Sequence, residues 1–327
     1  MRTPAVILAL AAALACACRD KEALDPGDSG SAPADENLAY HHTEQLLSFG
    51  PRPPQSNALK RCRDYIAQVL TPEGWQVATQ TFTAATPAGQ MTFINVIARH
   101  AGDGEDPWQR PVTGVIGAHL DSKIMPPQMR FVGADDAASA VGAILSLATQ
   151  LTPEEASAVE LVFFDGEEAI GLDMGPRPDG LFDGLYGSRA YAQRWANTPE
   201  KPDWGYILDM IGHKDLAIRL PSDSPPHLAR RLLAAAKAEG AEEVIKMGDS
   251  EVLDDHVPLN SAGIPAIDMI GDFQNSNWWH TDRDKLGLIS RESLALSEAV
   301  ALRFIRDLLA NPPRAEIPTP PPPGDDD

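Results

Sequence analysis

The chain has 327 residues, of which 43% are hydrophobic, 23% charged and 6% aromatic. This composition supplies enough apolar side chains for a sizeable core and argues against a wholly disordered chain. Asp and Glu number 47 against 27 Lys and Arg, so the formal net charge is -20. We expect no nucleic-acid partner, because so acidic a surface repels phosphate groups. Three cysteines cannot build a disulfide framework.

Residues 1–18 predict an export signal. A basic start is followed by an apolar run over residues 5–15, which is too short to span a bilayer, and then by Cys16 and Cys18. A cysteine that closes such a segment also resembles a bacterial lipobox, although no Leu stands three places before either one. We therefore expect an exported protein, periplasmic or anchored to the membrane through a lipid on Cys16 or Cys18. An ordinary cleaved signal peptide is the alternative.

The remaining chain divides by composition into three parts. Residues 19–38 are polar and predict a flexible tether, and residues 313–327 form a Pro-rich acidic tail. Residues 39–312 are expected to fold as one domain. Within it, apolar periodicity predicts helices over 41–49, 56–70, 137–151, 185–195, 227–239 and 290–309, and strands over 75–82, 93–99, 113–118, 159–164, 204–211 and 266–270. This alternation predicts an α/β fold with a mixed, mostly parallel central sheet flanked by helices.

Acidic and histidine side chains follow several of the predicted strands. His119 follows the third strand, Glu167 and Glu168 follow the fourth, and Asp209 lies at the end of the fifth. Ligand sites in open α/β sheets form at the carboxyl ends of the strands. Imidazole and carboxylate together favour zinc. Each group alone could be an acidic loop or a set of helix N-terminal acids, but their joint occurrence favours a site like that of a metal hydrolase.

Several ordered blocks resemble the glutaminyl cyclases (glutaminyl-peptide cyclotransferases), which are relatives of the co-catalytic zinc aminopeptidases. The blocks are Ala118-His-Leu-Asp-Ser-Lys123, Gly133-Ala-Asp-Asp-Ala-Ala138, Phe163-Phe-Asp-Gly-Glu-Glu-Ala169, Leu185-Tyr-Gly-Ser-Arg189, Asp254-Asp-His-Val-Pro258 and Trp279-His-Thr281. Gly50-Pro-Arg-Pro53 and Gly263-Ile-Pro265 extend the resemblance over about residues 40–310. It implies a zinc aminopeptidase-like fold.

The resemblance also implies a role for individual residues. Asp136, Glu168 and His280 would bind one Zn²⁺ per chain. Glu167 would be the general acid/base, supported by the acids Asp209 and Asp254. His119 matches a position that binds a second metal in the aminopeptidases and is usually unligated in the cyclases, so its occupancy stays open. A non-proline cis peptide is expected after the ligand aspartate, between Asp136 and Ala137.

The chain departs from the animal cyclases around the expected substrate pocket. Ala118 and Val141 stand near the places of a cysteine pair. Asp173 and Met174 lie about where those enzymes carry a tryptophan, and residues 271–278 are rich in Asn and Asp rather than Pro. Trp279 is predicted to form a wall of the pocket, although its side chain could equally belong to the core.

The implied activity is conversion of an N-terminal glutamine of peptides or proteins to pyroglutamate with release of ammonia, by a monomer. One alternative is a zinc aminopeptidase, in which His119 and Asp209 hold a second metal and Glu167 activates water. Another is a non-catalytic binding domain, which is disfavoured because such domains usually lose ligands, and none of the expected ligands is lost here.

Overall fold

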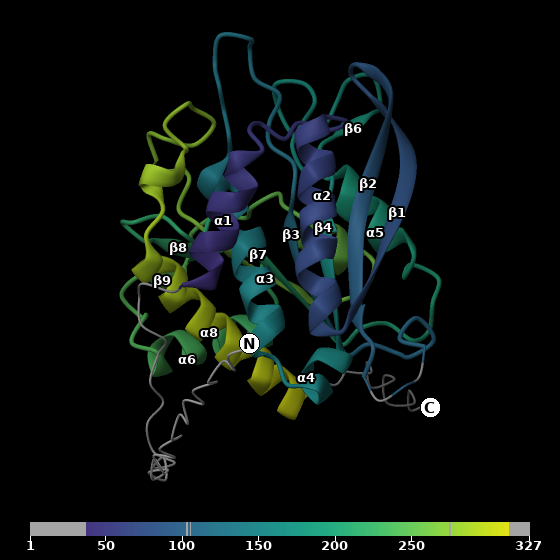
Figure 1. Cartoon of the computed structure of the whole chain (residues 1–327), viewed down its shortest axis with the longest axis vertical. Coiled ribbons are helices and arrows are strands. Elements are labelled where there is room, and N and C mark those ends of the chain that lie inside the picture. Colours follow the sequence, from purple (N-terminus) through teal and green to yellow (C-terminus); the bar gives the residue numbers. More distant parts are fainter. Residues whose placement is uncertain (1–36, 103, 105, 275, 314–327) are drawn as a thin grey trace, which may run out of the picture. The chain divides into compact units, whose positions relative to one another are not determined.

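A six-stranded mixed sheet forms the centre of the fold, in the order β1-β2-β4-β3-β7-β10 (Figure 1). β3, β4, β7 and β10 run parallel, while β2 pairs antiparallel with both β1 and β4. The strands are β1 (Trp75–Thr86), β2 (Gly89–His100), β3 (Gly114–His119), β4 (Val159–Phe164), β7 (Trp204–Asp209) and β10 (Ala266–Ile270). The predicted fold class is thereby confirmed.

The computed structural model describes residues 37–313 except 103, 105 and 275. These residues belong to a single compact unit. The predicted export signal, most of the tether and the tail after residue 313 lie outside the described residues and stay predictions. Among the described helices, none combines the length and apolarity that a bilayer crossing requires.

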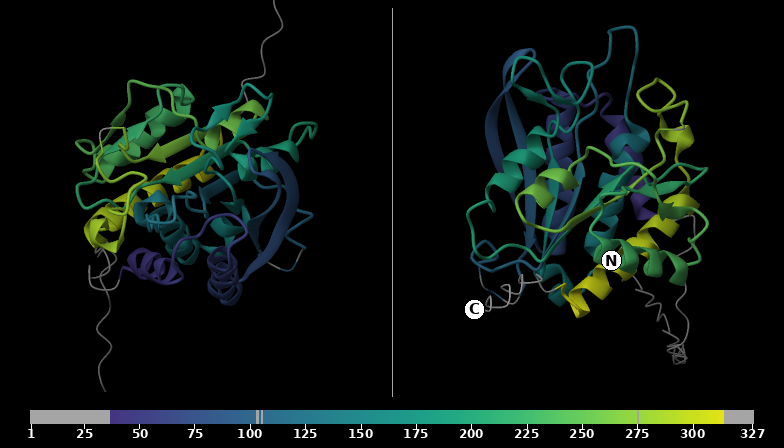
Figure 2. Two further views of the ribbon diagram at one scale, coloured as in Figure 1. Left: turned by 90° about the horizontal axis from the view of Figure 1, so that it is seen from above. Right: turned by 180° about the vertical axis from the view of Figure 1, so that it is seen from behind.

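Helices cover both faces of the sheet (Figure 2). On one face lie α1 (Leu38–Ser48), α2 (Asn57–Leu70), α3 (Ala140–Gln150) and α8 (Arg291–Ala310), and α6 (Pro226–Ala238) packs on α8 and β10. The other face carries α5 (Tyr186–Gln193) and α7 (His256–Ser261). Short elements complete the chain: η2 (Thr71–Glu73), η3 (Ala134–Ser139), α4 (Pro153–Ser157), β5 (Gly175–Pro176), β6 (Phe182–Asp183), β8 (Ile218–Leu220), β9 (Ile245–Met247) and η4 (Leu286–Leu288).

The burial of the strands follows from their sequences. Every residue of β3, β4, β7 and β10 is buried, as expected of apolar strands between two helical layers. β1 has exposed or partly buried residues along most of its length, because it lies at the edge of the sheet. Apolar side chains form one large cluster under α1, α2, α3, α6 and α8 and a smaller one under α5 and α7. The sheet is therefore held rigidly between two cores.

Several element boundaries differ from the prediction for local reasons. α1 begins at Leu38, ahead of the predicted residue 41, because the Asn37 side chain caps it by accepting a hydrogen bond from Tyr40 N. β1 and β2 extend to a tight hairpin, Thr86 pairing with Gly89. The predicted helix over 137–151 is regular only from Ala140, since the segment before it, η3, has non-helical backbone angles.

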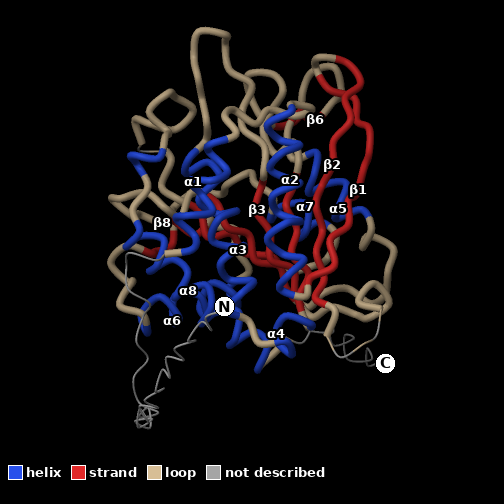
Figure 3. The backbone as a smooth tube through the Cα atoms, in the orientation of Figure 1, coloured by secondary structure: helices blue, strands red, loops and turns tan. Residues whose placement is uncertain are grey.

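The carboxyl ends of the parallel strands open onto the loops that follow them. β4 begins beside the end of β2, at Arg99, and runs toward the β1–β2 hairpin turn. Figure 3 shows long loops gathered at that end of the sheet. His119 and Asp209 are the last residues of β3 and β7, Asp136, Glu167, Glu168 and His280 lie in the segments after β3, β4 and β10, and Asp254 precedes α7. The fold brings these residues to the carboxyl end of the parallel strands.

One buried acid links three helices away from this edge. Glu298 of α8 accepts hydrogen bonds from the side chains of Asn37, at the start of α1, and Gln150, at the end of α3, each at 3.3 Å. Burial raises the pKa of Glu298 to about 7, although these hydrogen bonds oppose the change. Its charged form is therefore disfavoured in the folded protein.

Glu298→Gln should stabilise the protein at pH 8 and change its stability little at pH 5. Unfolded, the carboxyl titrates at about 4.3, so between that pH and about 7 the folded protein binds more protons. The free energy of unfolding contributed by this group falls as pH rises through this window and stays low above it. Thermal unfolding at both pH values, with the exposed Glu242→Gln as control, measures the difference. Equal changes at pH 5 and pH 8 would contradict it.

Candidate active site

A buried arginine ties together the loops that form the site. The guanidinium of Arg52 lies in the loop between α1 and α2 and donates hydrogen bonds to the carbonyl oxygens of Leu120 (3.1 Å), Val132 (2.5 Å) and Gly133 (2.9 Å). Its own backbone N–H donates to the Ser122 hydroxyl. Both ends of the long loop after β3 are thereby joined to one side chain, which explains why a Gly-Pro-Arg-Pro segment far away in sequence belongs with the site.

The backbone around Asp136 is held in an unusual shape. Gly133 has a φ of +56°, and a Cβ atom there would lie 1.9 Å from the Asp136 carbonyl oxygen, so only glycine fits. The Asp284 carboxylate accepts hydrogen bonds from the backbone N–H groups of Asp135 (2.8 Å) and Asp136 (3.2 Å). The peptide between Asp136 and Ala137 is cis, as the resemblance implies. This segment directs the Asp136 carboxylate toward two histidines.

Asp136, Glu168 and His280 converge on one point. The Nε2 atom of His280 lies 3.4 Å from Asp136 Oδ2 and 3.3 Å from Glu168 Oε2. Both carboxylates are buried, and the His280 side chain is 19% exposed. His280 has a φ of +53°, a strained backbone angle for a non-glycine residue of the kind that is concentrated at functional sites. The three predicted ligands are thus together.

This group fits a tetrahedral metal ion. Two ligands at about 2.0–2.1 Å from such an ion lie roughly 3.3–3.4 Å apart, which matches the separations from His280 to the two carboxylates. Apart from the contact of Asp136 Oδ2 with His280, the buried atoms Asp136 Oδ2 and Glu168 Oε1 have no hydrogen-bond partner among the described residues. A bound cation would satisfy these oxygen atoms. Histidine nitrogen and carboxylate oxygen are both zinc ligands, and catalytic zinc sites have three protein ligands and a fourth position open for water or substrate.

A second group shares Asp136 with the first. His119 Nε2 lies 3.1 Å from Asp136 Oδ1 and 3.5 Å from Asp209 Oδ1. These three side chains could also hold a metal ion. The 3.1 Å contact is however a normal hydrogen-bond distance, so His119 has a partner without any ion. The geometry therefore permits one ion or two.

Opposite charges balance one another in this group. Burial opposes ionisation of Asp136, but hydrogen bonds from His119 and His280 hold its pKa well below the usual range. Burial would lower the pKa of His280, yet hydrogen bonds to Asp136 and Glu168 outweigh it and raise the pKa to about 9. A metal ion that binds His280 must displace a proton there, so its affinity depends on pH.

Glu167 adjoins a predicted ligand but is not part of either metal group. Its backbone N–H donates to Asp121 Oδ1 at 3.1 Å, and its Oε2 lies 4.0 Å from His119 Nδ1. Burial raises the pKa of Glu167 well above its usual value; nearby His119 opposes this, and the carboxylates of Glu168 and Asp254 add to it. Burial likewise raises the pKa of Asp209. The protonated form of Glu167 is therefore favoured relative to that of a solvent-exposed glutamate.

These residues surround one pocket with a volume of about 470 Å³. The structure places all seven residues singled out from the sequence in its lining: Asp136, Glu167, Glu168, Asp209, Asp254, Trp279 and His280. The Trp279 ring stacks on His280 with ring centroids 3.8 Å apart and remains 38% exposed, so it forms a wall of the pocket. Leu172, Asp173 and Met174 also line the pocket.

Sequence reasoning assigned no role to several acids that the structure buries near the site. Asp284 holds the backbone of the ligand loop, and nothing distinguishes it in sequence from a surface loop acid. Asp268 lies fully buried near Asp254. A single aspartate inside the apolar strand 266–270 is a signal that could have identified it, because an unpaired buried charge needs compensation.

Several known proteins are similar to this chain in sequence and in fold. Residues 95–305 match Peptidase family M28. A glutaminyl-peptide cyclotransferase of Bothrops jararaca is 30% identical over 284 residues, which cover 73% of this chain and 72% of that protein. A glutaminyl cyclase structure from an Acidobacteriales bacterium is 29% identical with a TM-score of 0.72, covering 88% of this chain and 99% of the other. A Zn-dependent exopeptidase from Parabacteroides distasonis is 28% identical with a TM-score of 0.68, covering 84% and 97%.

The chain belongs to peptidase family M28 and, within it, to the glutaminyl-peptide cyclotransferases.

Wild-type protein dialysed against zinc and then freed of excess metal should retain one ion per chain. His280→Ala should lose it, because three protein ligands leave no spare donor. His119→Ala should keep it, since His119 does not contribute to the first group. Elemental analysis of the three proteins measures the metal content. Two ions in the wild type, falling to one in His119→Ala, would instead place a second ion on His119.

Proposed function

We propose that the protein converts the N-terminal glutamine of peptides or proteins to pyroglutamate and releases ammonia. The observation that carries this proposal is the division between two adjacent glutamates. Glu168 belongs to the group of possible metal ligands with Asp136 and His280. Glu167 lines the same pocket, has a raised pKa and is not one of these ligands. The names of the cyclase relatives support the same reaction.

We propose zinc as the resident metal, held by Asp136, Glu168 and His280. Bound there, zinc would act as a Lewis acid that polarises the side-chain amide carbonyl of the substrate. The Zn-dependent exopeptidase of similar structure and the mixed imidazole and carboxylate donors support this choice of metal.

Glu167 is suited to carry the proton that the reaction moves. The substrate α-amine attacks its own side-chain amide, so a C–N bond forms, the amine loses a proton and the amide nitrogen leaves as ammonia. Glu167 accepts the amine proton and donates it to the leaving nitrogen, with no net proton change. Asp209 and Asp254 line the same pocket. Their carboxyl groups make the surroundings of Glu167 more negative, which keeps the proton near the reacting atoms.

The walls of the pocket can hold the substrate in a reactive shape. Because the attack is intramolecular, fixing the amine against the amide removes much of the entropic barrier. Trp279 offers a flat apolar surface beside the metal group, stacked on His280 and in contact with Phe273. We propose that this surface packs against the glutamine side chain and excludes water from the competing hydrolysis.

An aminopeptidase activity is the second candidate, and one observation favours it. His119, Asp136 and Asp209 form a second group that could hold an ion, as two-metal peptidases require. In that case Glu167 would activate water to cleave a peptide bond.

Substrate assays separate the two activities directly. Zinc-loaded protein is incubated with Gln-Ala-amide and, separately, with Leu-amide. A cyclase releases ammonia from Gln-Ala-amide with a mass loss of one ammonia and leaves its peptide bond intact. Hydrolysis of Leu-amide without cyclisation would establish the aminopeptidase instead.

Glu167→Gln should abolish turnover while the metal stays bound. The substitution keeps the shape of the side chain and removes its proton acceptor, so turnover should fall by about 10²–10⁴-fold. Glu168→Gln should lose metal and activity together, because a neutral amide is a weaker zinc donor. Parallel measurement of zinc content and ammonia release gives the contrast. The roles are reversed if Glu167→Gln loses zinc while Glu168→Gln retains it.

A further inference from the structure

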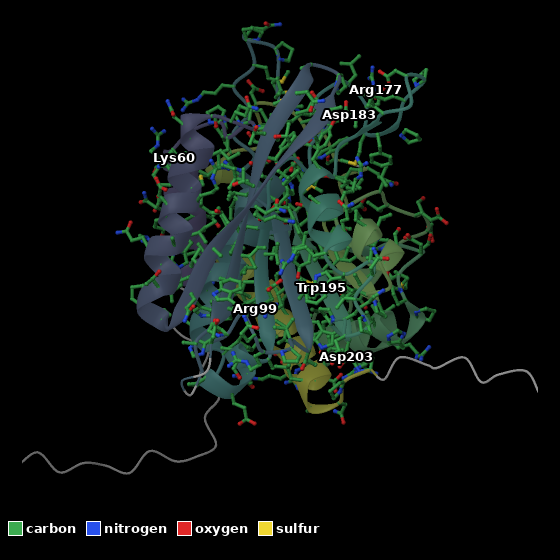
Figure 4. The ribbon with its side chains drawn as sticks, turned by 90° about the vertical axis from the view of Figure 1, so that its right-hand side faces the viewer. Lys60, Arg99, Arg177, Asp183, Trp195 and Asp203 are labelled. Carbon is green, nitrogen blue, oxygen red and sulfur yellow. The ribbon has the colours of Figure 1, made fainter. Side chains whose placement is uncertain are left out.

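A second, apolar groove lies beside the active-site pocket, between α5 and α7. It has a volume of about 360 Å³. The helix α5 can be found in Figure 4 between the labels of Asp183, which precedes it, and Trp195, which follows it. Leu185 and Ala192 of the α5 segment form one side, and Val257 and Pro258 of α7 form the other. None of the residues described above for metal binding or proton transfer lines this groove.

The chemistry of the groove differs from that of the rest of the molecule. The chain has a formal net charge of -20, yet no acidic residue lines the groove. The one charged residue is Arg189, whose guanidinium lies over the Phe182 ring at 4.8 Å and donates to the Phe182 carbonyl oxygen. Apolar surface with little charge suits an apolar peptide segment.

The groove and the active-site pocket adjoin one another at Leu253. Leu253 lines both the pocket and the groove, and it is 40% exposed. Asp254, the next residue, faces the pocket. A peptide that places its first residue beside Asp254 and leaves the pocket on this side therefore crosses Leu253 and reaches the groove.

We propose that the groove between α5 and α7 binds apolar side chains of the substrate at its third to fifth residues, so that the enzyme prefers N-terminal segments of that kind over dipeptides. This inference rests on the proposed cyclase function, since it concerns the chain that follows the glutamine. An extended chain advances about 3.3 Å per residue, so a longer peptide whose first residue is in the pocket extends further across Leu253 and along the groove than a dipeptide does.

Two hexapeptides of matched length and one dipeptide test this proposal. The substrates are Gln-Ala-amide, Gln-Ala-Leu-Leu-Leu-Ala-amide and Gln-Ala-Ser-Ser-Ser-Ala-amide. The groove is filled by Ala196→Trp, an exposed groove residue at the end of α5. Ala310→Trp makes the same change at an exposed position at the end of α8 and is the control. KM and kcat are measured for wild type and both variants with each of the three peptides.

Wild type should process the leucine hexapeptide with a kcat/KM at least tenfold above that of the serine hexapeptide, through a lower KM. Tenfold is 1.4 kcal/mol, which is less than burial of one leucine side chain supplies. Ala196→Trp should remove this preference and leave Gln-Ala-amide turnover within about twofold of wild type. Ala310→Trp should behave as wild type.

Three outcomes would overturn the inference. Wild type could process both hexapeptides alike, or Ala196→Trp could slow Gln-Ala-amide as much as the leucine hexapeptide. Sedimentation could also show a dimer that Ala196→Trp dissociates, in which case a second copy of the chain occupies the groove. Absence of cyclisation of every peptide by wild type would instead refute the proposed function itself.

Discussion

The site depends on one constraint, which is the burial of many carboxyl groups at the carboxyl end of the parallel strands. Buried acidic side chains in this region include Asp121, Asp135, Asp136, Asp165, Glu167, Glu168, Asp209, Asp254, Asp255, Asp268 and Asp284. Removing each charge from water costs several kcal/mol unless it is balanced. The available cations are few, chiefly His119, His280 and Lys123, which lies 3.5 Å from Glu168. Burial therefore raises the pKa of Glu167 and Asp209, and a bound cation would relieve the same cost.

Rigid loops keep these carboxylates in place despite their repulsion. Arg52 joins the two ends of the loop after β3, and Asp284 holds the backbone of Asp136. The two hydrophobic clusters fix the strands from which the loops emerge. Contacts within the protein therefore position the donor atoms, and such positioning reduces the reorganisation that binding and catalysis require. The same rigidity sets Glu167 beside the metal group without making it a ligand.

Sequence patterns predict the centre of this fold better than its edges. β4 and β10 match the predicted strands residue for residue, because short runs of mainly apolar residues are typical of buried parallel strands. α7 was not predicted, since six residues with an internal Pro258 carry no helical periodicity. All seven residues that were assigned a role reach one pocket, because the ends of β3, β4 and β7 bring several of them together, while Asp254 comes from the segment before α7. Asp284 was missed, since its role is a hydrogen bond to the backbone of Asp136, which only the folded chain creates.

The free energy of unfolding as a function of zinc concentration tests most directly whether a cation balances the buried carboxylates. An ion that binds only the folded protein stabilises it by about 2.7 kcal/mol at a free concentration one hundred times its Kd. We expect the Tm of wild type to rise steadily with zinc and to fall with a chelator, and the Tm of His280→Ala to respond to neither. A wild-type Tm that is the same in zinc and in chelator would contradict the account.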